Sequence, residues 1–263
     1  MDLDLLGKTA VITGGSMGIG KAIAKQLAFE GMDIVIAART LGTLELAADE
    51  ISKETGAKVS SVIVDTGDDL SVREMVRKSI DLLGRVDVLV NCAAMPGGMS
   101  APPELENITN DQFWSDMNIK VLGYLRCAKE VSPIMKQNGW GRIINISGLA
   151  ARQSGNTVGS MRNVAVVAMT KNLADELGPF GINVTVVHPG ATRTEKTPAN
   201  LARQSKNLGI TIDEVEQRMA ESNSVKKIIS ADDIAYIVAF LASPKSVAIN
   251  GDVIAAGGGT SRD

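Results

Sequence analysis

Thr13-Gly14-Gly15-Ser16-Met17-Gly18-Ile19-Gly20 joins an apolar run to an amphipathic segment near the start of the chain. The preceding residues 9–12 predict a buried strand, and in residues 21–28 apolar side chains recur at helical spacing. A glycine-rich turn at a helix N-terminus leaves backbone N–H groups free to bind a pyrophosphate, which the helix dipole also favours. This context predicts a dinucleotide-binding turn, and the alternative is an ordinary strand-to-helix connection.

The composition indicates one α/β domain over residues 1–263. The chain is 44% apolar with a formal net charge of −3, and acidic and basic residues are interspersed, so nothing indicates a nucleic-acid or membrane partner. No apolar run is long enough to cross a bilayer, and the first residues do not resemble a secretory signal. Cys92 and Cys127 are too few for a disulfide framework, and no His/Cys cluster indicates a metal site. We therefore expect a cytoplasmic protein without a metal.

Apolar, β-branched runs alternate with helical patterns along the whole chain. The expected strands are residues 9–12, 33–38, 59–64, 86–90, 142–146, 183–187 and 253–255. The expected helices are residues 21–28, 44–55, 71–83, 110–136, 160–177 and 231–241. This alternation predicts a doubly wound parallel sheet of about seven strands with helices on both faces, the Rossmann fold. The charged, helical stretch 195–225 is interpreted as a mobile lid, or as a surface helical excursion.

The carboxyl ends of such strands bind ligands, and they carry informative residues here. Residues 33–38 are followed by Arg39-Thr40, where a site specific for NAD commonly has an acidic residue for the ribose 2′-OH. Arg39 instead suits a 2′-phosphate, unless it is a solvated surface arginine. The sequence therefore favours NADP(H), with NAD(H) as a possible cofactor. The other strand ends carry Asp65-Thr66, Asn91-Cys92-Ala93-Ala94, Ser147-Gly148 and residues 188–194.

Several of these motifs together resemble the short-chain dehydrogenase/reductase family over about residues 6–258. The motifs are Thr13-Gly-x-x-x-Gly-Ile-Gly20, Asp65, Asn91-x-Ala, Asn118, Asn145-Ile146-Ser147 and Pro189-Gly190-x-x-x-Thr194. The resemblance implies hydride transfer between NAD(P) and a carbonyl or alcohol of a small molecule. It also implies a homodimer or homotetramer paired through residues 110–136 and 155–178 and through the C-terminal segment. It places residues 95–99 and 195–224 at the substrate mouth. The expected cofactor-binding residues are Gly14, Ser16, Met17, Gly18, Ile19, Gly20, Arg39, Thr40, Asp65, Thr66, Asn91, Ala93, Pro189, Gly190, Thr192 and Thr194.

The chain departs from this family at its acid–base residues. The family uses a tyrosine that exchanges the hydroxyl proton, with a lysine four residues later that lowers the tyrosine pKa. Counting back from Thr170-Lys171 puts Gly159 in the tyrosine position and Asn163 in the lysine position. The chain has two tyrosines, Tyr124 and Tyr236, and neither is on this helix, so we interpret both as core or interface residues.

Three residues remain as candidate catalytic groups. Ser147 precedes Gly148, which stands in the usual serine position, so Ser147 either faces the substrate or satisfies backbone groups at the strand end. Asn118 matches the family's helix-kinking asparagine, which holds a water, and the alternative is a structural role. Asn163 could hold a water together with Asn118.

Two hypotheses follow from this pattern. The first is an atypical NAD(P)-dependent oxidoreductase, which the retained nicotinamide-end motif of Pro189-Gly190 and Thr194 favours. The second is a cofactor-binding protein without dehydrogenase activity, a sensor or structural partner, which the loss at positions 159 and 163 favours. If the chain is an enzyme, we expect slow turnover of unactivated substrates, because a placed acid–base group typically supplies roughly 10²–10⁴-fold.

Overall fold

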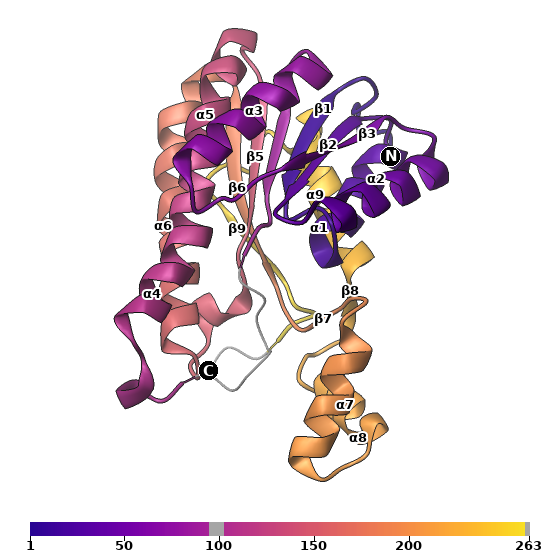
Figure 1. Ribbon diagram of the computed structural model, residues 1–263, viewed down its shortest axis with the longest axis vertical. Coiled ribbons are helices and arrows are strands. Elements are labelled where there is room, and N and C mark those ends of the chain that lie inside the picture. The colour runs from indigo at the N-terminus through magenta and orange to yellow at the C-terminus, as the bar shows by residue number, and fades with distance from the viewer. Residues whose placement is uncertain (95–102, 261–263) are drawn as a thin grey trace.

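The computed structural model describes residues 1–94 and 103–260 and contains a seven-stranded parallel sheet (Figure 1). The strand order is β3-β2-β1-β4-β5-β6-β9, so the chain crosses from the edge strand β3 back to β4, beside β1. The expected doubly wound fold is confirmed. The strands are β1 (Thr9–Thr13), β2 (Asp33–Ala38), β3 (Val59–Ile63), β4 (Val88–Asn91), β5 (Gly141–Ile146), β6 (Ile182–Pro189) and β9 (Val253–Ala256), with a small pair β7 (Thr192–Arg193) and β8 (Ile229–Ser230).

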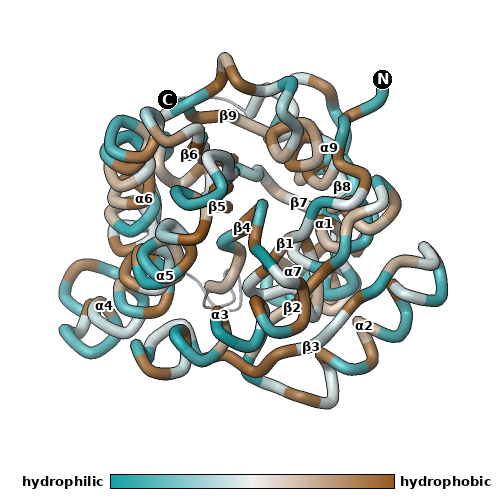
Figure 2. Tube along the Cα trace, turned by 90° about the horizontal axis from the view of Figure 1, so that it is seen from above, coloured by the Kyte–Doolittle hydropathy of each residue, from teal (hydrophilic) through white to brown (hydrophobic). Residues whose placement is uncertain are grey.

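Helices cover both faces of the sheet, as the view from above shows (Figure 2). One face carries α1 (Gly18–Phe29), α2 (Leu41–Thr55) and α9 (Ala231–Ala242). The other carries α3 (Asp69–Leu83), α5 (Gly123–Asn138) and α6 (Thr157–Leu177). Short 3₁₀ turns lie at Leu105–Asn107, Leu149–Arg152, Gly178–Phe180 and Pro244–Ser246.

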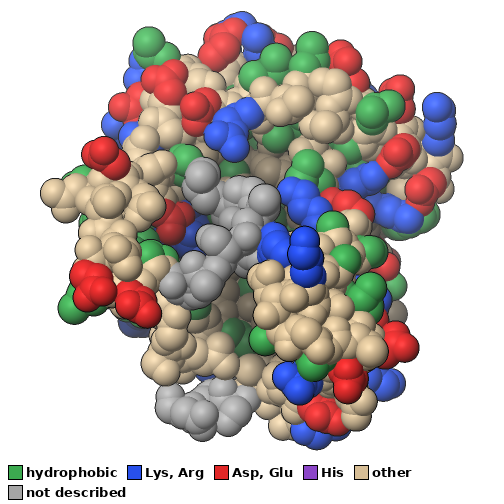
Figure 3. All heavy atoms as spheres, turned by 60° about the horizontal axis from the view of Figure 1, so that its bottom comes forward, with side chains coloured by type: hydrophobic (Ala, Val, Ile, Leu, Met, Phe, Trp, Pro, Cys, Tyr) green, Lys and Arg blue, Asp and Glu red, His purple; other side chains and the backbone are tan. Residues whose placement is uncertain are grey.

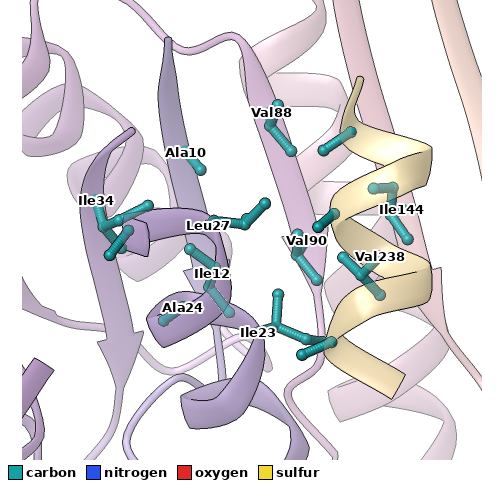
Figure 4. Packing of buried hydrophobic residues seen from close by; sticks show 14 of the residues in the cluster. Ala10, Ile12, Ile23, Ala24, Leu27, Ile34, Val88, Val90, Ile144 and Val238 are labelled. Carbon is teal, nitrogen blue, oxygen red and sulfur yellow. The ribbon is translucent and has the colours of Figure 1, made fainter. Parts of the chain in front are cut away.

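The core follows from the alternation of side chains along buried strands. In β1, Ile12 points into the layer formed with α1 and α9, whereas Val11 points into the layer formed with α3, α5 and α6. Helix α1 meets the sheet through Ile23 and Leu27, one helical turn apart, and Val238 of α9 completes this packing (Figure 4). Burial on both faces explains why these strands are continuous apolar runs.

The helix expected over residues 110–136 is interrupted in the structure. It consists of α4 (Asn110–Met117), a π-helical turn (Asn118–Leu122) and α5. The Arg126 guanidinium stabilises this break by donating to the backbone and side-chain oxygens of Asn118, at 3.1 and 2.8 Å. A π-helical turn inside a helix frequently marks a functional site.

The stretch expected to form a lid contains two helices, α7 (Thr197–Leu208) and α8 (Ile212–Glu221), which project from one end of the sheet (Figure 1). Acidic and basic side chains are interspersed over this end of the molecule (Figure 3). Within residues 1–94 and 103–260, no helix combines the length and apolar character needed to cross a membrane.

The interpretation of Tyr124 as a core residue is confirmed, since its side chain is fully buried and its hydroxyl donates to the Ile146 carbonyl at 2.9 Å. Tyr236 is not a core residue: 58% of it is exposed.

Tyr124→Phe should lower the free energy of unfolding by about 1–2 kcal/mol, because it leaves the buried carbonyl of Ile146 without this donor. Urea unfolding measures this loss, with Tyr236→Phe as the matched control. Equal stability of the two variants would contradict the assignment.

Candidate active site

The turn after β1 and the loop after β4 lie in close contact at the point where the strand order reverses. The Thr13 hydroxyl accepts from the backbone N–H groups of Cys92 and Ala93, at 3.2 and 3.3 Å. Gly14 has φ +70°, and a Cβ there would lie 2.9 Å from the Ala93 nitrogen. A Cβ on Gly20 would collide with the Gly14 carbonyl. Glycine at these two positions therefore lets the N-terminus of α1 face the crevice.

A cavity of about 510 Å³ opens beside this turn and gathers most of the expected cofactor residues. Its lining includes Gly14, Ser16, Met17, Gly18, Ile19, Gly20, Arg39, Thr40, Asp65, Thr66, Ala93, Thr192 and Thr194. Asn91 is fully buried and donates to Asn145, and its own Oδ1 has no hydrogen-bond partner among the described residues. The glycine turn and the N-terminus of α1, which line this cavity, fit a dinucleotide, which these residues would hold.

A second cavity, of about 550 Å³, lies at the ends of β5 and β6. Pro189 and Gly190 line it, and a Cβ on Gly190 would lie 2.8 Å from the Cα of Gly257. The other lining residues are Leu149, Ala150, Gln153, Ser154, Ala191, Ser222, Asn223 and Thr260. None of these described residues has a charged side chain, so the cavity suits an uncharged, polar molecule. Residues 95–99, also expected at the substrate mouth, lie outside the described residues.

Gly159 lies in the first turn of α6, and its backbone N–H takes part in the N-terminal cap of this helix. Asn156 caps α6 by accepting from the Gly159 N–H at 2.8 Å. A Cβ on Gly159 would lie 2.7 Å from the Asn156 side chain, so a tyrosine there would displace this cap. At the usual serine position, a Cβ on Gly148 would lie 3.0 Å from Asn163 Nδ2. The packing around positions 148 and 159 therefore suits glycine rather than the serine and tyrosine that are usual in the family.

The structure brings together two of the three candidate catalytic residues. The Ser147 hydroxyl donates to the Asn163 carbonyl at 3.3 Å, and the Asn163 amide donates to the Gly148 carbonyl at 3.4 Å. The Asn118 amide instead donates to the Gly67 carbonyl at 3.1 Å and accepts from Arg126. Catalytic roles for all three remain predictions.

Lys120, in the π-helical turn, is the functional candidate that sequence reasoning missed. Its Nζ donates to the Ser147 carbonyl at 3.1 Å and to Asn163 Oδ1 at 3.2 Å, and only 3% of the residue is exposed. Burial lowers the pKa of Lys120 from 10.5 to about 7, and nearby Arg162 acts in the same direction. The helical spacing of the sequence could have indicated its burial, because Lys120 falls on the same helix face as Tyr124 and Val131, which are both buried.

Two other ionisable groups near the site have hydrogen-bond partners within the protein. His188 Nδ1 accepts from the Gly148 N–H at 3.1 Å, and burial lowers the pKa of His188 to about 4, so the ring is neutral at pH 7. Arg162 donates to both oxygens of Asp116, at 2.6 and 2.8 Å. Of Lys120 and His188, Lys120 is the group whose pKa lies near neutral pH.

Glu195 reaches into the cofactor cavity from the loop before α7. Its carboxylate accepts from the Gly18 N–H at 2.7 Å, at the N-terminus of α1. A helix N-terminus favours any anion, so the carboxylate takes a position that also suits a phosphate oxygen.

Comparison with known proteins agrees with this geometry. A family model described as enoyl-(acyl carrier protein) reductase matches residues 14–261. The chain belongs to the short-chain dehydrogenase/reductase family. Two relatives are the NADPH-dependent reductase BacG of Bacillus subtilis, 33% identical over 96% of this chain and 97% of that protein, and the 3-oxoacyl-[acyl-carrier-protein] reductase FabG of Staphylococcus epidermidis, 31% identical over 97% and 99%. L-Sorbose reductase from Gluconobacter frateurii, solved with NADPH and L-sorbose, superposes with a TM-score of 0.92 at 28% identity, covering 99% and 98% of the two chains.

For this family member, Arg39→Ala should weaken NADPH binding by about 10- to 100-fold, because it removes a charge-assisted hydrogen bond to the 2′-phosphate. NADH affinity should change little, since NADH lacks that phosphate. Calorimetric titration with both cofactors provides the measurement and its internal control. An unchanged ratio of the two affinities would show that Arg39 does not contact the phosphate.

Glu195→Gln should tighten NADPH binding by about 2- to 5-fold, because it removes a negative charge that competes with the phosphates at the N-terminus of α1. Glu221→Gln, an equal change of charge at the end of α8, is the control and should leave the affinity unchanged. Weaker binding in Glu195→Gln would contradict the competition and indicate that Glu195 supports the bound cofactor.

Proposed function

We propose that the chain is an NADPH-dependent reductase that acts on the carbonyl group of a small, uncharged, polar molecule. The observation that carries this proposal is that one short segment of the chain lines both cavities. The segment 189–194 lines both, with Pro189 and Gly190 in one and Thr192 and Thr194 in the other. A cofactor and a substrate bound in these cavities would meet at this segment, at the carboxyl ends of β5 and β6.

The two ends of the cofactor cavity support different parts of the proposal. At the adenosine end, the absence of an acidic residue after β2 and the presence of Arg39 favour NADPH. At the other end, the nicotinamide supplies the hydride when bound. The small residues Cys92, Ala93 and Ala94 of the loop after β4 line the cavity and leave space for it.

The relatives support a reductase over a protein that only binds the cofactor. BacG and FabG are named as reductases, and the L-sorbose reductase structure contains both NADPH and a neutral sugar substrate. Xylitol dehydrogenase with bound NAD⁺ also superposes, with a TM-score of 0.88 at 25% identity over 97% and 100% of the two chains. NAD(H) therefore stays a possible second cofactor.

Assembly, lid and location belong to the same proposal. Several apolar side chains on α4 to α6 are exposed: Trp114, Leu122, Leu125, Met161 and Val164. A homodimer or homotetramer would cover them, and sedimentation of the purified protein tests this assembly.

Helices α7 and α8 would act as the lid, since Ser222 and Asn223, which follow α8, line the second cavity. The free thiols Cys92 and Cys127 are compatible with a cytoplasmic enzyme.

A panel of carbonyl compounds tests the proposed function. With NADPH, neutral hydroxyketones and polar ketones should be reduced with kcat/KM at least about tenfold above that of matched keto acids, because a carboxylate would be buried without a cation. NADPH oxidation measures the rates, and calorimetry confirms that the cofactor binds. Binding of NADPH without reduction of any compound would instead favour the protein that binds the cofactor without dehydrogenase activity.

A further inference from the structure

The ammonium group of Lys120 occupies a position that needs a chemical explanation. It lies in the interior, at the carboxyl end of β5, and it contacts a backbone carbonyl and an amide oxygen rather than a carboxylate. Asp116, whose charge acts on the pKa of Lys120, is already paired with Arg162. A buried charge without an ionic partner is costly, so a purely structural donor at this position would be better served by a neutral side chain.

The partners of Lys120 connect it to the positions where the family's acid–base residues are replaced. Its Nζ bonds Asn163, the residue in the family's lysine position. It also bonds the carbonyl of Ser147, next to Gly148 in the usual serine position. Lys120 reaches this point from the π-helical turn between α4 and α5, whereas Asn163 comes from α6. A lysine from one helix thus contacts the asparagine that stands where a lysine is expected on another.

We propose that Lys120 is the proton source of the reduction and replaces the missing tyrosine–lysine pair of this site. The proposal rests on the reductase function proposed above. In the protonated state, the Nζ–H bond breaks and an O–H bond forms on the substrate oxygen, directly or through one water. The reduced nicotinamide supplies the two electrons and the hydride that go to the carbonyl carbon. The neutral amine left on Lys120 then takes a proton from solvent, so the step balances.

The charged groups around Lys120 are consistent with a proton that is exchanged near neutral pH. Arg162 on α6 and burial lower its pKa, whereas Cys92 after β4 and Asp116 on α4 raise it. Cys92 and Tyr124 are themselves neutral at pH 7, because burial raises both of their pKa values. His188 at the end of β6 is neutral as well. An amine with a pKa of about 7 can both hold and release a proton at the working pH.

Three variants and one control separate proton donation from a structural role. Lys120→Met removes the proton, Lys120→Arg keeps the charge and the donors but cannot release a proton, and the exchange Lys120→Asn with Asn163→Lys moves the amine to the other helix. Lys129→Met, at an exposed position on α5, is the matched control. The kcat for ketone reduction is measured from pH 5.5 to 9.5 for each protein, after calorimetry has confirmed that NADPH binds.

The wild type and the control should lose activity above about pH 7, where Lys120 is neutral. Lys120→Met and Lys120→Arg should both show kcat reduced by roughly 10²–10⁴-fold with no inflection near pH 7. The double exchange should recover at least about tenfold over Lys120→Asn alone. If Lys120→Arg keeps near-wild-type activity, or if the inflection persists in Lys120→Met, the proposal is wrong.

A second readout uses the protein without cofactor, so it also applies if the reductase function fails. Because the folded pKa of about 7 lies below the unfolded value of 10.5, the unfolded state binds more protons between these pH values. The stability of the wild type relative to Lys120→Met should therefore rise between pH 7 and 9.5. The unfolding constant of the wild type, relative to that of the variant, should fall by up to about tenfold per pH unit. A difference that does not change with pH would show that Lys120 stays charged and overturn the proposal.

Discussion

The contact between the turn after β1 and the loop after β4 is the constraint on which the site depends. These two strands are neighbours in the sheet, but their connections run to opposite faces, so a crevice opens between their carboxyl ends. The Thr13 hydroxyl holds the two loops together, and Gly14 lets their backbones approach. A larger residue at position 14 would separate the loops, and the N-terminus of α1 would lose its position beside the crevice.

The positions where the family's acid–base residues are replaced show how the same fold can carry a different group. Gly159 and Gly148 are packed against asparagine side chains, so the usual residues have no ready space. Lys120 enters from the helix break and contacts Asn163. Hydride transfer depends mainly on the orientation of the cofactor, whereas the proton can come from any group with a suitable pKa within reach. The fold therefore retains the geometry of cofactor binding, while the proposed proton source comes from the turn between α4 and α5 instead of from α6.

The sequence predicted the fold well because buried parallel strands and amphipathic helices have strong, local periodicities. It also predicted most residues of the cofactor cavity, because parallel strands end at one edge of the sheet. Periodicity alone did not predict the π-helical turn, since the apolar pattern continues through Asn118–Leu122, although the resemblance to the family indicated a helix kink at Asn118. The burial of Lys120 was not predicted, because it depends on contacts with Ser147 and Asn163. The Glu195 contact with Gly18 joins residues 177 positions apart, and no local pattern encodes it.

A crystal structure with NADP⁺ and an unreactive alcohol product or analogue would show directly whether Lys120 is the proton source. We expect the Nζ of Lys120 to lie within hydrogen-bonding distance of the alcohol oxygen, or to be joined to it by one ordered water, and to be the nearest titratable group to that oxygen. Another titratable side chain in that place, from this chain or from a second subunit, would contradict this expectation.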